Sequence, residues 1–469
     1  MSHTSRRDFL ALGGAATLAG LPLNAAWASE IADPQTPREP HFPAKAKAVI
    51  WLHMAGAPST LDLFDYKPEL VRLAGTPLPD SFAKNLKTAT DGGVGNLLAT
   101  KRTWKQYGET GAWVSDLLPN LSKQVDDIAF LKGCKTDGST HVISSLKLHT
   151  AGLVPGRPAL GSWVQYALGS ANPDLPAFVV LPTGTGAAGG GRGQVIWSSG
   201  FLPAAYQGTA FRKGDSPILH LARPEGVSEV EQRGTLDLIR ALNEHADSAR
   251  TADTELAART RSYELAYRMQ KSAPEAVDLD KESAATKALY GIGTKETDEY
   301  GTSLLRARRL VERGVRFVHC ISGAPSNDID SWDAHNGIEK NHGVMCKQVD
   351  KPIAGLLADL KARGLLDSTL VVWTSEFGRT PYGQSGDGRD HNPWGYTSWI
   401  AGGGIKPGTF GATDDLGLRA VSGIVDTYDL QATLLHQLGL DHKKIVFAYQ
   451  GRSERPTSVF GDVVKEILA

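Results

Sequence analysis

The sequence is poor in several features that would assign it quickly to a class. It contains only three cysteines, Cys134, Cys320 and Cys346, too few and too scattered for a disulfide framework or a thiolate zinc cluster. The balance of 50 Lys and Arg against 51 Asp and Glu leaves a net charge of −1. That charge argues against a strongly basic nucleic-acid binder and against binding to anionic membranes by bulk electrostatics. No stretch after the N-terminal segment reaches the roughly 18 apolar residues of a membrane-spanning helix.

Familiar catalytic motifs are missing as well. The chain has no GxxxxGK[ST], no GxSxG and no HExxH, so the P-loop, α/β-hydrolase and zincin interpretations lose their usual support. Gly184–Gly189 does fit the dinucleotide pattern GxGxxG. That fingerprint needs a helix opening at its third glycine, whereas further glycines follow here at 190, 191 and 193. We therefore expect a loop, and an exported dinucleotide oxidoreductase would depend on this pattern alone.

Glycine, by contrast, is abundant. The 469 residues include 51 glycines, where about 33 would be ordinary for this length. Hydrophobic residues make up 41% of the chain, enough to bury a substantial core. Length alone would allow about three domains, although large α/β domains often exceed that rule. The glycine excess predicts many tight loops on one folded scaffold.

The N-terminus carries an export signal. Ser5–Leu10 reads Ser-Arg-Arg-Asp-Phe-Leu, a twin-arginine pattern, and the apolar run Phe9–Leu23 that follows is too short to cross a bilayer. Ala26–Ala28 supplies small residues for cleavage before Ser29. We predict a signal peptide at residues 1–28, a partnership with the twin-arginine export machinery, and a periplasmic or extracellular location.

Short apolar runs alternate with amphipathic segments along the rest of the chain. Each run is typical of a strand buried on both faces, and the alternation predicts an α/β fold with a mostly parallel central sheet flanked by helices. The predicted strands are 48–52, 128–131, 177–181, 316–321 and 369–373, with a weaker one at 399–401. The predicted helices are 160–168, 348–363 and 429–438.

Residues 228–313 differ from their surroundings. They show almost no strand pattern and many charges, so we predict a helical insertion with a solvated face. The predicted organisation is a signal peptide at 1–28, a linker at 29–47 and one large α/β domain at 48–469 that contains this insertion.

Polar clusters follow the predicted strands, where ligands bind in open α/β sheets. His and carboxylate side chains from several strand ends can hold a divalent metal ion with oxygen and imidazole donors. Two arginines beside them can grip an anion, and Ser139 and Thr140 precede a predicted helix, whose free N–H groups favour an anion. The metal candidates are Asp62, Asp333, His335, Glu376 and His391, and the arginines are Arg379 and Arg389.

Several of these residue types have simpler structural roles. Asp62 is as well explained by a helix cap as by a site, and His149 remains open between packing and ligation. His319 lies inside a predicted strand, so we expect a satisfied core histidine there. His436 and His442 flank the end of the last long helix, where packing or a dipole interaction is expected.

Five segments resemble the DUF1501 family in the order in which they occur. They are Trp197–Pro203, Trp332–His335, Glu376–Pro381, Gly388–His391 and Ala401–Gly404. The resemblance implies an alkaline phosphatase/sulfatase-like fold, a divalent metal at the strand ends, and a Ser, Thr or modified Cys nucleophile at a helix start.

The resemblance places a nucleophile near Thr140 or His141, and His141 can instead ligate the metal or act as a base. The sulfatase-like Thr-Ser-Asp-His-Gly turn is similar to Thr374–Gly378, with Glu376 keeping the carboxylate and Phe377 unable to bind metal. Cys134 lacks the formylglycine motif. The acid usual after the first strand is also missing, so His53 or Asp62 would have to replace it.

The resulting hypothesis is an exported metal-dependent hydrolase or transferase. Its substrate would be a small anionic ester, sulfated or phosphorylated, and the metal would be Zn, Ca, Mg or Mn. Thr140, His141, Arg379 and Arg389 are the predicted catalytic residues. The alternative is a non-catalytic exported binding or assembly protein with a degenerate site on the same fold.

Overall fold

The computed structural model describes residues 34–84, 86, 93–185, 193–214, 217–218, 221–248 and 254–469. The predicted signal peptide at 1–28 lies outside these residues, as do the last four residues of the GxGxxG segment (186–189) and the three that follow it. The predicted linker at 29–47 is described only from residue 34, and the division of the chain into a signal peptide, linker and domain stays a prediction.

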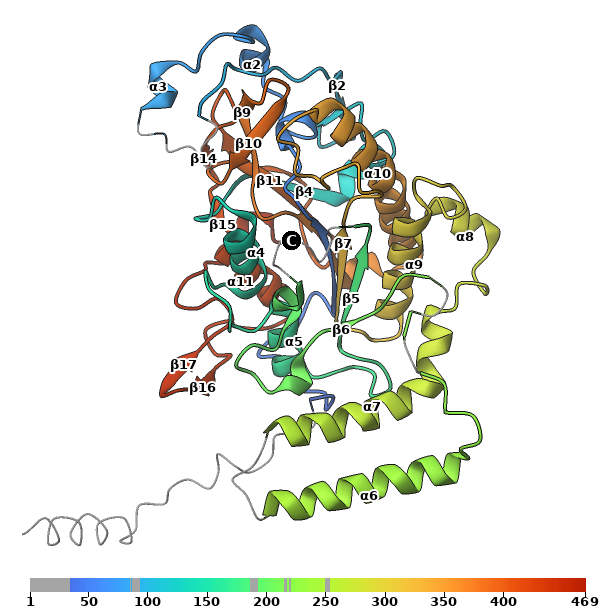
Figure 1. Cartoon of the computed structure of the whole chain (residues 1–469). Coiled ribbons are helices and arrows are strands. Elements are labelled where there is room, and N and C mark those ends of the chain that lie inside the picture. The colour runs from blue at the N-terminus through green and yellow to red at the C-terminus, as the bar shows by residue number, and fades with distance from the viewer. Residues whose placement is uncertain are drawn as a thin grey trace, which may run out of the picture.

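A nine-stranded sheet forms the centre of the protein (Figure 1). Its order is β12-β4-β11-β8-β1-β7-β5-β6, with β15 paired to β4. Strand β11 runs antiparallel to β4 and β8, and the other pairings described in this sheet are parallel. The strands are β1 (Ala48–Met54), β4 (Ile128–Lys135), β5 (Phe178–Thr183), β6 (Thr209–Ala210), β7 (Phe317–Ser322), β8 (Thr369–Thr374), β11 (Tyr396–Ala401), β12 (Gly408–Phe410) and β15 (Val425–Asp426). The predicted mostly parallel α/β fold and all six predicted strands are confirmed.

Strand β1 shows why the runs are continuously apolar. It lies between β7 and β8, and all seven of its residues are buried. Ile50, Leu52 and Met54 join one hydrophobic cluster, whereas Val49 and Trp51 join the other. Successive side chains point to opposite faces of a strand, so a strand covered on both faces needs an apolar residue at almost every position.

Helices cover the two faces (Figure 1). One face carries α9 (Asp298–Glu312) and α10 (Ile338–Ala362), whose buried leucines belong to the cluster of Ile50 and Leu52. The other carries α4 (His141–Thr150), α5 (Leu160–Leu168) and α11 (Thr427–Gln437), which bury side chains with Trp51. The three predicted helices are present, although α10 begins ten residues before the predicted start at 348.

The charged segment 228–313 is helical but not a single unit. Helices α6 (Glu229–Ser248) and α7 (Thr254–Val277) lie side by side and project beyond the sheet (Figure 1), joined by the Arg233–Glu264 ion pair. Helix α8 (Ala284–Leu289) follows. Helix α9, in contrast, buries Leu304 and Leu305 in the main core, because its apolar residues share one face of the helix.

Smaller elements border the sheet. The two-stranded pairs and short helices are β2 (Trp104–Tyr107) with β3 (Ala112–Ser115), β9 (Gly378–Gln384) with β10 (Gly388–Asn392), β13 (Ala412–Thr413) with β14 (Ala420–Ser422), β16 (Phe447–Tyr449) with β17 (Arg452–Glu454), α2 (Pro68–Arg72) and α3 (Asp80–Ala83). Residues 388–391, one of the five segments that resemble the DUF1501 family, form strand β10 of a hairpin, where no strand was predicted. Within the described residues, no helix combines the length and apolar surface needed to cross a bilayer.

Candidate metal centre

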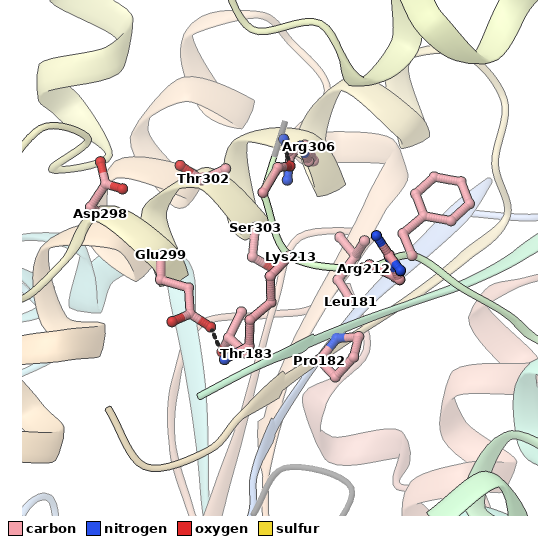
Figure 2. Close-up of a pocket in the computed structure, with 12 residues that line it drawn as sticks. Leu181, Pro182, Thr183, Arg212, Lys213, Asp298, Glu299, Thr302, Ser303 and Arg306 are labelled. Atoms are coloured by element: carbon pink, nitrogen blue, oxygen red, sulfur yellow. Dashed lines mark hydrogen bonds and ion pairs between the residues drawn. The ribbon is translucent and has the colours of Figure 1, made fainter. Parts of the chain in front are cut away.

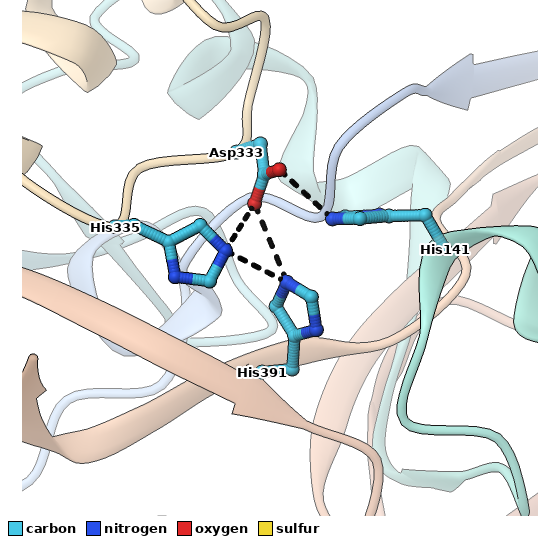
Figure 3. Close-up of side chains that lie close together, drawn as sticks. All are labelled: His141, Asp333, His335 and His391. Carbon is cyan, nitrogen blue, oxygen red and sulfur yellow. Dashed lines mark hydrogen bonds and ion pairs between the residues drawn. The ribbon is translucent and has the colours of Figure 1, made fainter. Parts of the chain in front are cut away.

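Four side chains from three parts of the chain meet near the carboxyl ends of the central strands (Figure 3). His141 is the first residue of α4, and His391 lies in β10. Asp333 and His335 lie in the loop between β7 and α10. One ligand atom from each lies within 4.8 Å of those of the other three, so the fold brings together three predicted metal ligands and the predicted catalytic residue His141.

Asp333 is at the centre of the group. Its Oδ2 lies 3.0 Å from Nε2 of His141, and its Oδ1 lies 2.9 Å from Nε2 of His335 and 3.4 Å from Nε2 of His391. Each histidine therefore turns the same ring nitrogen, Nε2, toward one carboxylate (Figure 3). The side chains of Asp333 and His335 remain 28% and 30% exposed, so solvent reaches this group.

The opposite ring nitrogen of each histidine, Nδ1, faces an oxygen that can accept a hydrogen bond. The pairs are His141 Nδ1 with Glu376 Oε1 at 2.7 Å, His391 Nδ1 with the Ser139 carbonyl at 2.7 Å, and His335 Nδ1 with Gln384 Oε1. Such a partner holds the proton on Nδ1 and leaves a lone pair on Nε2. In metal sites, a hydrogen bond from the ring nitrogen that does not bind the metal orients the histidine.

The donor set fits a metal ion. Nε2 of His335 and Nε2 of His391 are only 3.0 Å apart, so in the neutral rings two lone pairs would face each other. A proton or a cation between them removes that repulsion. On a tetrahedral zinc ion with Zn–N bonds of about 2.0–2.1 Å, two ligand nitrogens are roughly 3.3 Å apart, close to this spacing.

The electrostatics favour a cation in this group. Burial alone would raise the pKa of Asp333, but the charge of Arg379 and bonds from the three histidines hold it far below its ordinary value. Burial lowers the pKa of His391. In His141 the bonds to Asp333 and Glu376 overcome burial and raise the pKa, and the bond to Asp333 raises that of His335. The carboxylate is therefore ionised, and metal competes with protons for two of the rings.

Glu376 lies beside the group rather than in it. It is buried, and its Oε1 also accepts from the backbone N–H of Gly56 at 3.1 Å, while its Oε2 lies 3.2 Å from His53 Nε2. We predicted Glu376 as a metal ligand. The structure instead uses both of its oxygens to orient His141 and His53.

The guanidinium groups of the two predicted anion-binding arginines bind carboxylates and backbone carbonyls of the protein itself. Arg379 pairs with Asp333 and donates from Nε to the Ala57 carbonyl at 2.8 Å and from Nη1 to the Arg389 carbonyl at 3.2 Å. Arg389 donates from Nε to Asp62 Oδ2 at 2.9 Å. Arg379 therefore positions Asp333, and the structure offers no support for an anion on either guanidinium, because both are buried among protein acceptors.

Asp62, the fifth predicted metal ligand, lies outside the group. It is buried, accepts from Ser59 Oγ at 2.5 Å and binds Arg389. Its two oxygens face these donors, so the structure places Asp62 in a buried ion pair rather than at the metal. Thr140, which with His141 marks the predicted position of the nucleophile, is the N-cap of α4 and makes no side-chain cap bond. It is exposed, next to His141.

Two glycines let the backbone come close around the group. A Cβ on Gly388 would overlap the backbone carbonyl of His335, and a Cβ on Gly56, whose φ is +107°, would lie 2.8 Å from the Asp333 nitrogen. Phe377 fills the position where a sulfatase-like turn has a histidine. The centroid of its ring lies 4.4 Å from that of His391 and 4.9 Å from that of His141, so it packs against two histidines of the group and has no atom that can bind metal.

The sequence did not predict the residues that orient the histidines of the group by hydrogen bonds. Gln384 and the Ser139 carbonyl carried no recognisable motif, because a hydrogen-bond acceptor for a histidine can come from many residue types. The missing acid after β1 was the one signal that pointed to His53, which binds Glu376.

A separate pocket of about 340 Å³ lies between the end of β5, residues 211–214 and α9 (Figure 2). It shares no residue with the metal group. Glu299 in its wall pairs with Lys213 at 2.8 Å and accepts from the Gly184 N–H at 2.6 Å. Arg306 donates to the Gly214 carbonyl. Because these charged groups bind one another and the backbone, the pocket carries no comparable chemistry.

Comparison with solved structures finds similar folds at low identity. They include the lipoteichoic acid synthase LtaP from Listeria monocytogenes (10% identity, 86% of this chain, 76% of that chain, TM-score 0.39) and the sulfatase PsFucS1 from Pseudoalteromonas sp. (13%, 92%, 72%, 0.36). The alkaline phosphatase from the Antarctic bacterium TAB5 also matches (12%, 77%, 92%, 0.29). Likenesses at these TM-scores carry no argument about what this chain does.

Comparison with curated proteins finds no relative of this chain. The family described as "Protein of unknown function (DUF1501)" matches residues 46–468, a span that contains all five sequence segments and the whole metal group. The chain belongs to the DUF1501 family.

Proposed function

We propose that this chain is an exported, metal-dependent hydrolase or transferase that acts on a small anionic ester, a phosphate or a sulfate. The observation that supports it most directly is the convergence of three Nε2 atoms on Asp333, each ring held by an acceptor at Nδ1. Three imidazoles and one carboxylate favour Zn²⁺ or another first-row ion over Mg²⁺ and Ca²⁺. Export rests on the twin-arginine pattern at Ser5–Leu10.

A metal ion bound here supplies positive charge for the ester oxygens and lowers the pKa of a water molecule. The chain's own groups prepare the site. Arg379 holds Asp333, Glu376 holds His141, and Phe377 packs against two of the histidine rings.

The first turn of α4 lies directly beside the group, since it begins at His141. Free backbone N–H groups at a helix start favour an anion, and Thr140 offers a hydroxyl not spent on capping. The exposed edges of Asp333 and His335 leave a way in for a substrate. Thr140 and a water molecule remain the two candidate nucleophiles.

The test is turnover on a panel of phosphate and sulfate esters by purified protein reconstituted separately with Zn²⁺, Mn²⁺, Mg²⁺ and Ca²⁺. We expect ester hydrolysis with a first-row ion, reduced at least 100-fold in His391→Ala, because loss of such a group typically costs about 10²–10⁴-fold. His436→Gln is the matched control, since His436 lies on α11 against Phe42. Turnover that survives His391→Ala unchanged would contradict the proposal.

One observation favours the second candidate, a non-catalytic binding protein. Three histidines and an aspartate provide four protein donors, the number that fills a closed structural zinc site. Cobalt-substituted protein separates the two. An absorption spectrum that changes on adding phosphate or sulfate indicates an open position, whereas an unchanged spectrum together with no turnover favours the binding protein.

A further inference from the structure

A second group of histidines lies deeper in the protein, on the α4 side of the sheet. His53 belongs to β1, His319 to β7 and His149 to α4. In the register of β1 and β7, Trp51 pairs with His319, so His53 and His319 point to the same face, two positions apart. Ring centroids are 4.6 Å apart for His53–His149 and His149–His319, and 5.7 Å for His53–His319.

The ring nitrogens of these three histidines lie close enough together to hold one metal ion. One ligand nitrogen from each lies within 4.8 Å of those of the other two, and all three residues are buried. We expected His319 to be a satisfied core histidine. Instead, Nε2 of His319 and Nδ1 of His53 are buried and have no hydrogen-bond partner in the described part of the chain. A buried polar atom left unpaired carries a desolvation penalty, and a cation bound by both ring nitrogens would remove it.

The protonation of the rings suits a cation. His53 Nε2 faces Glu376 Oε2 at 3.2 Å, and an ionised carboxylate only accepts, so the His53 proton is held on Nε2 and the lone pair is on Nδ1. This is the carboxylate–histidine arrangement that orients metal ligands. Burial, with the nearby His53, lowers the pKa of His319 well below its ordinary value, so that ring is neutral and can ligate.

We propose that His53, His149 and His319 form a second metal site that binds Zn²⁺. Three imidazoles without a carboxylate ligand suit zinc and not the oxygen-seeking Mg²⁺ or Ca²⁺. The proposal does not depend on ester hydrolysis, because the ligands are distinct from those at Asp333.

The second ion acts on the protein rather than on a substrate. A cavity of about 10 Å³ borders His149 and His319, room for one water molecule at most. Glu376 contacts His53 through one oxygen and His141 through the other. An ion held by His53 therefore fixes the carboxylate that orients His141, and it stabilises the negative charge of that buried group.

Anomalous diffraction at the zinc edge from crystals of the whole exported chain grown with Zn²⁺ tests the proposal without any variant. We expect one peak among His53, His149 and His319 in addition to any peak at Asp333. Absence of that peak overturns the inference. A peak there without one at Asp333 supports the inference while removing the basis of the proposed function, so the two can fail separately.

Zinc content per chain provides the second measurement. His319→Ala should lose one zinc ion, His391→Ala should lose the other, and His442→Ala should retain both, because buried His442 binds Thr457 away from both groups. A His319→Ala protein that keeps its full zinc content would contradict the proposal. If His319→Ala does not fold, the wild-type anomalous map alone decides.

Discussion

At the scale of single residues, Glu376 has the largest expected effect for a side chain that binds no metal. Its Oε1 accepts from His141 and its Oε2 faces His53. In Glu376→Gln one of these oxygens becomes an amide group that donates, so one histidine loses the acceptor that fixes its ring. Residues that hydrogen-bond to a metal-binding histidine typically contribute about 10–100-fold to metal affinity.

We therefore expect Glu376→Gln to weaken Zn²⁺ binding by about 10–100-fold, measured by competition with a fluorescent chelator. The control is Glu339→Gln, on the first turn of α10 and paired with Arg102, which should bind zinc as the wild type does. Equal affinity in Glu376→Gln and wild type would refute the role assigned to Glu376.

Asp62 gives the corresponding prediction for stability. Burial alone would raise its pKa, but the charge of Arg389 and bonds from Arg389 and Ser59 lower it below 3.8. Its stabilising contribution is therefore complete above the unfolded-state pKa and is lost only as the pH falls through the depressed folded-state pKa. Asp62→Asn leaves Arg389 buried without its charge partner, which typically costs about 3–5 kcal/mol.

Denaturant unfolding of wild type and Asp62→Asn at several pH values measures this effect. The difference in unfolding free energy should be largest at neutral pH. It should shrink below about pH 3.8, where the Asp62 carboxyl of the unfolded chain takes up a proton while the folded chain still holds it ionised. If the difference in unfolding free energy between wild type and Asp62→Asn stays constant at acidic pH, the Asp62–Arg389 ion pair does not cause it. Zinc binding by a folded Asp62→Asn should be normal, because Asp62 touches none of the ligands.

The sequence was informative about residue types and less so about their partners. Asp333, His335 and His391 could be singled out because polar residues follow strand ends. Glu376, Arg379 and Asp62 have the same chemistry in a sequence, and only the fold decides whether a carboxylate faces a metal, a histidine or an arginine. Pairings between residues over 300 positions apart, such as Asp62 with Arg389, have no local signature.

At the scale of elements, the β9–β10 hairpin sets the position of two histidines of the Asp333 group, His391 and His335. His391 lies opposite Arg379 in the hairpin register, and the backbone of Gly388 lies against the backbone of His335. Gly388→Ala adds a Cβ that overlaps the His335 carbonyl, so the loop that carries Asp333 and His335 must move away from His391. The ligand atoms then separate.

We expect Gly388→Ala to fold but to bind Zn²⁺ at least 10-fold more weakly, since metal sites tolerate only small displacements of their ligands. Isothermal titration of metal-free protein measures the change. Gly343→Ala in α10 is the matched control, because a Cβ there meets nothing within 4 Å, and helical alanine is favoured over glycine. Unchanged affinity in Gly388→Ala would show that the hairpin does not position His335.

Strands were easier to predict than these connections. Continuous apolar runs give β1, β5, β7 and β8 directly, because strands covered on both faces need them. The hairpin at 378–392 was missed because buried arginine, aspartate and histidine occupy it in place of apolar residues. The helical segment 228–313 was visible from its charges, but the packing of α9 on the sheet was not.

At the scale of the whole molecule, the Asp333 group joins parts of the chain that lie far apart in the sequence. The ligands of the Asp333 group come from the start of α4, the loop after β7 and the strand β10. A metal ion that binds the folded chain and not the unfolded one stabilises it by about 2.7 kcal/mol at a concentration 100 times its Kd. Binding should therefore raise the unfolding temperature of the entire α/β domain.

The size of that rise should depend on the ion. Metal-free protein should gain stability with Zn²⁺, less with Mn²⁺, and little with equal concentrations of Mg²⁺ or Ca²⁺, because imidazole donors suit borderline ions. Differential scanning calorimetry measures the shift, and His436→Gln should respond as the wild type does. His391→Ala should keep only the part of the zinc shift that comes from His53, His149 and His319. A larger shift with Ca²⁺ than with Zn²⁺ would mean that carboxylates rather than the histidines hold the ion, and would reassign the ligands.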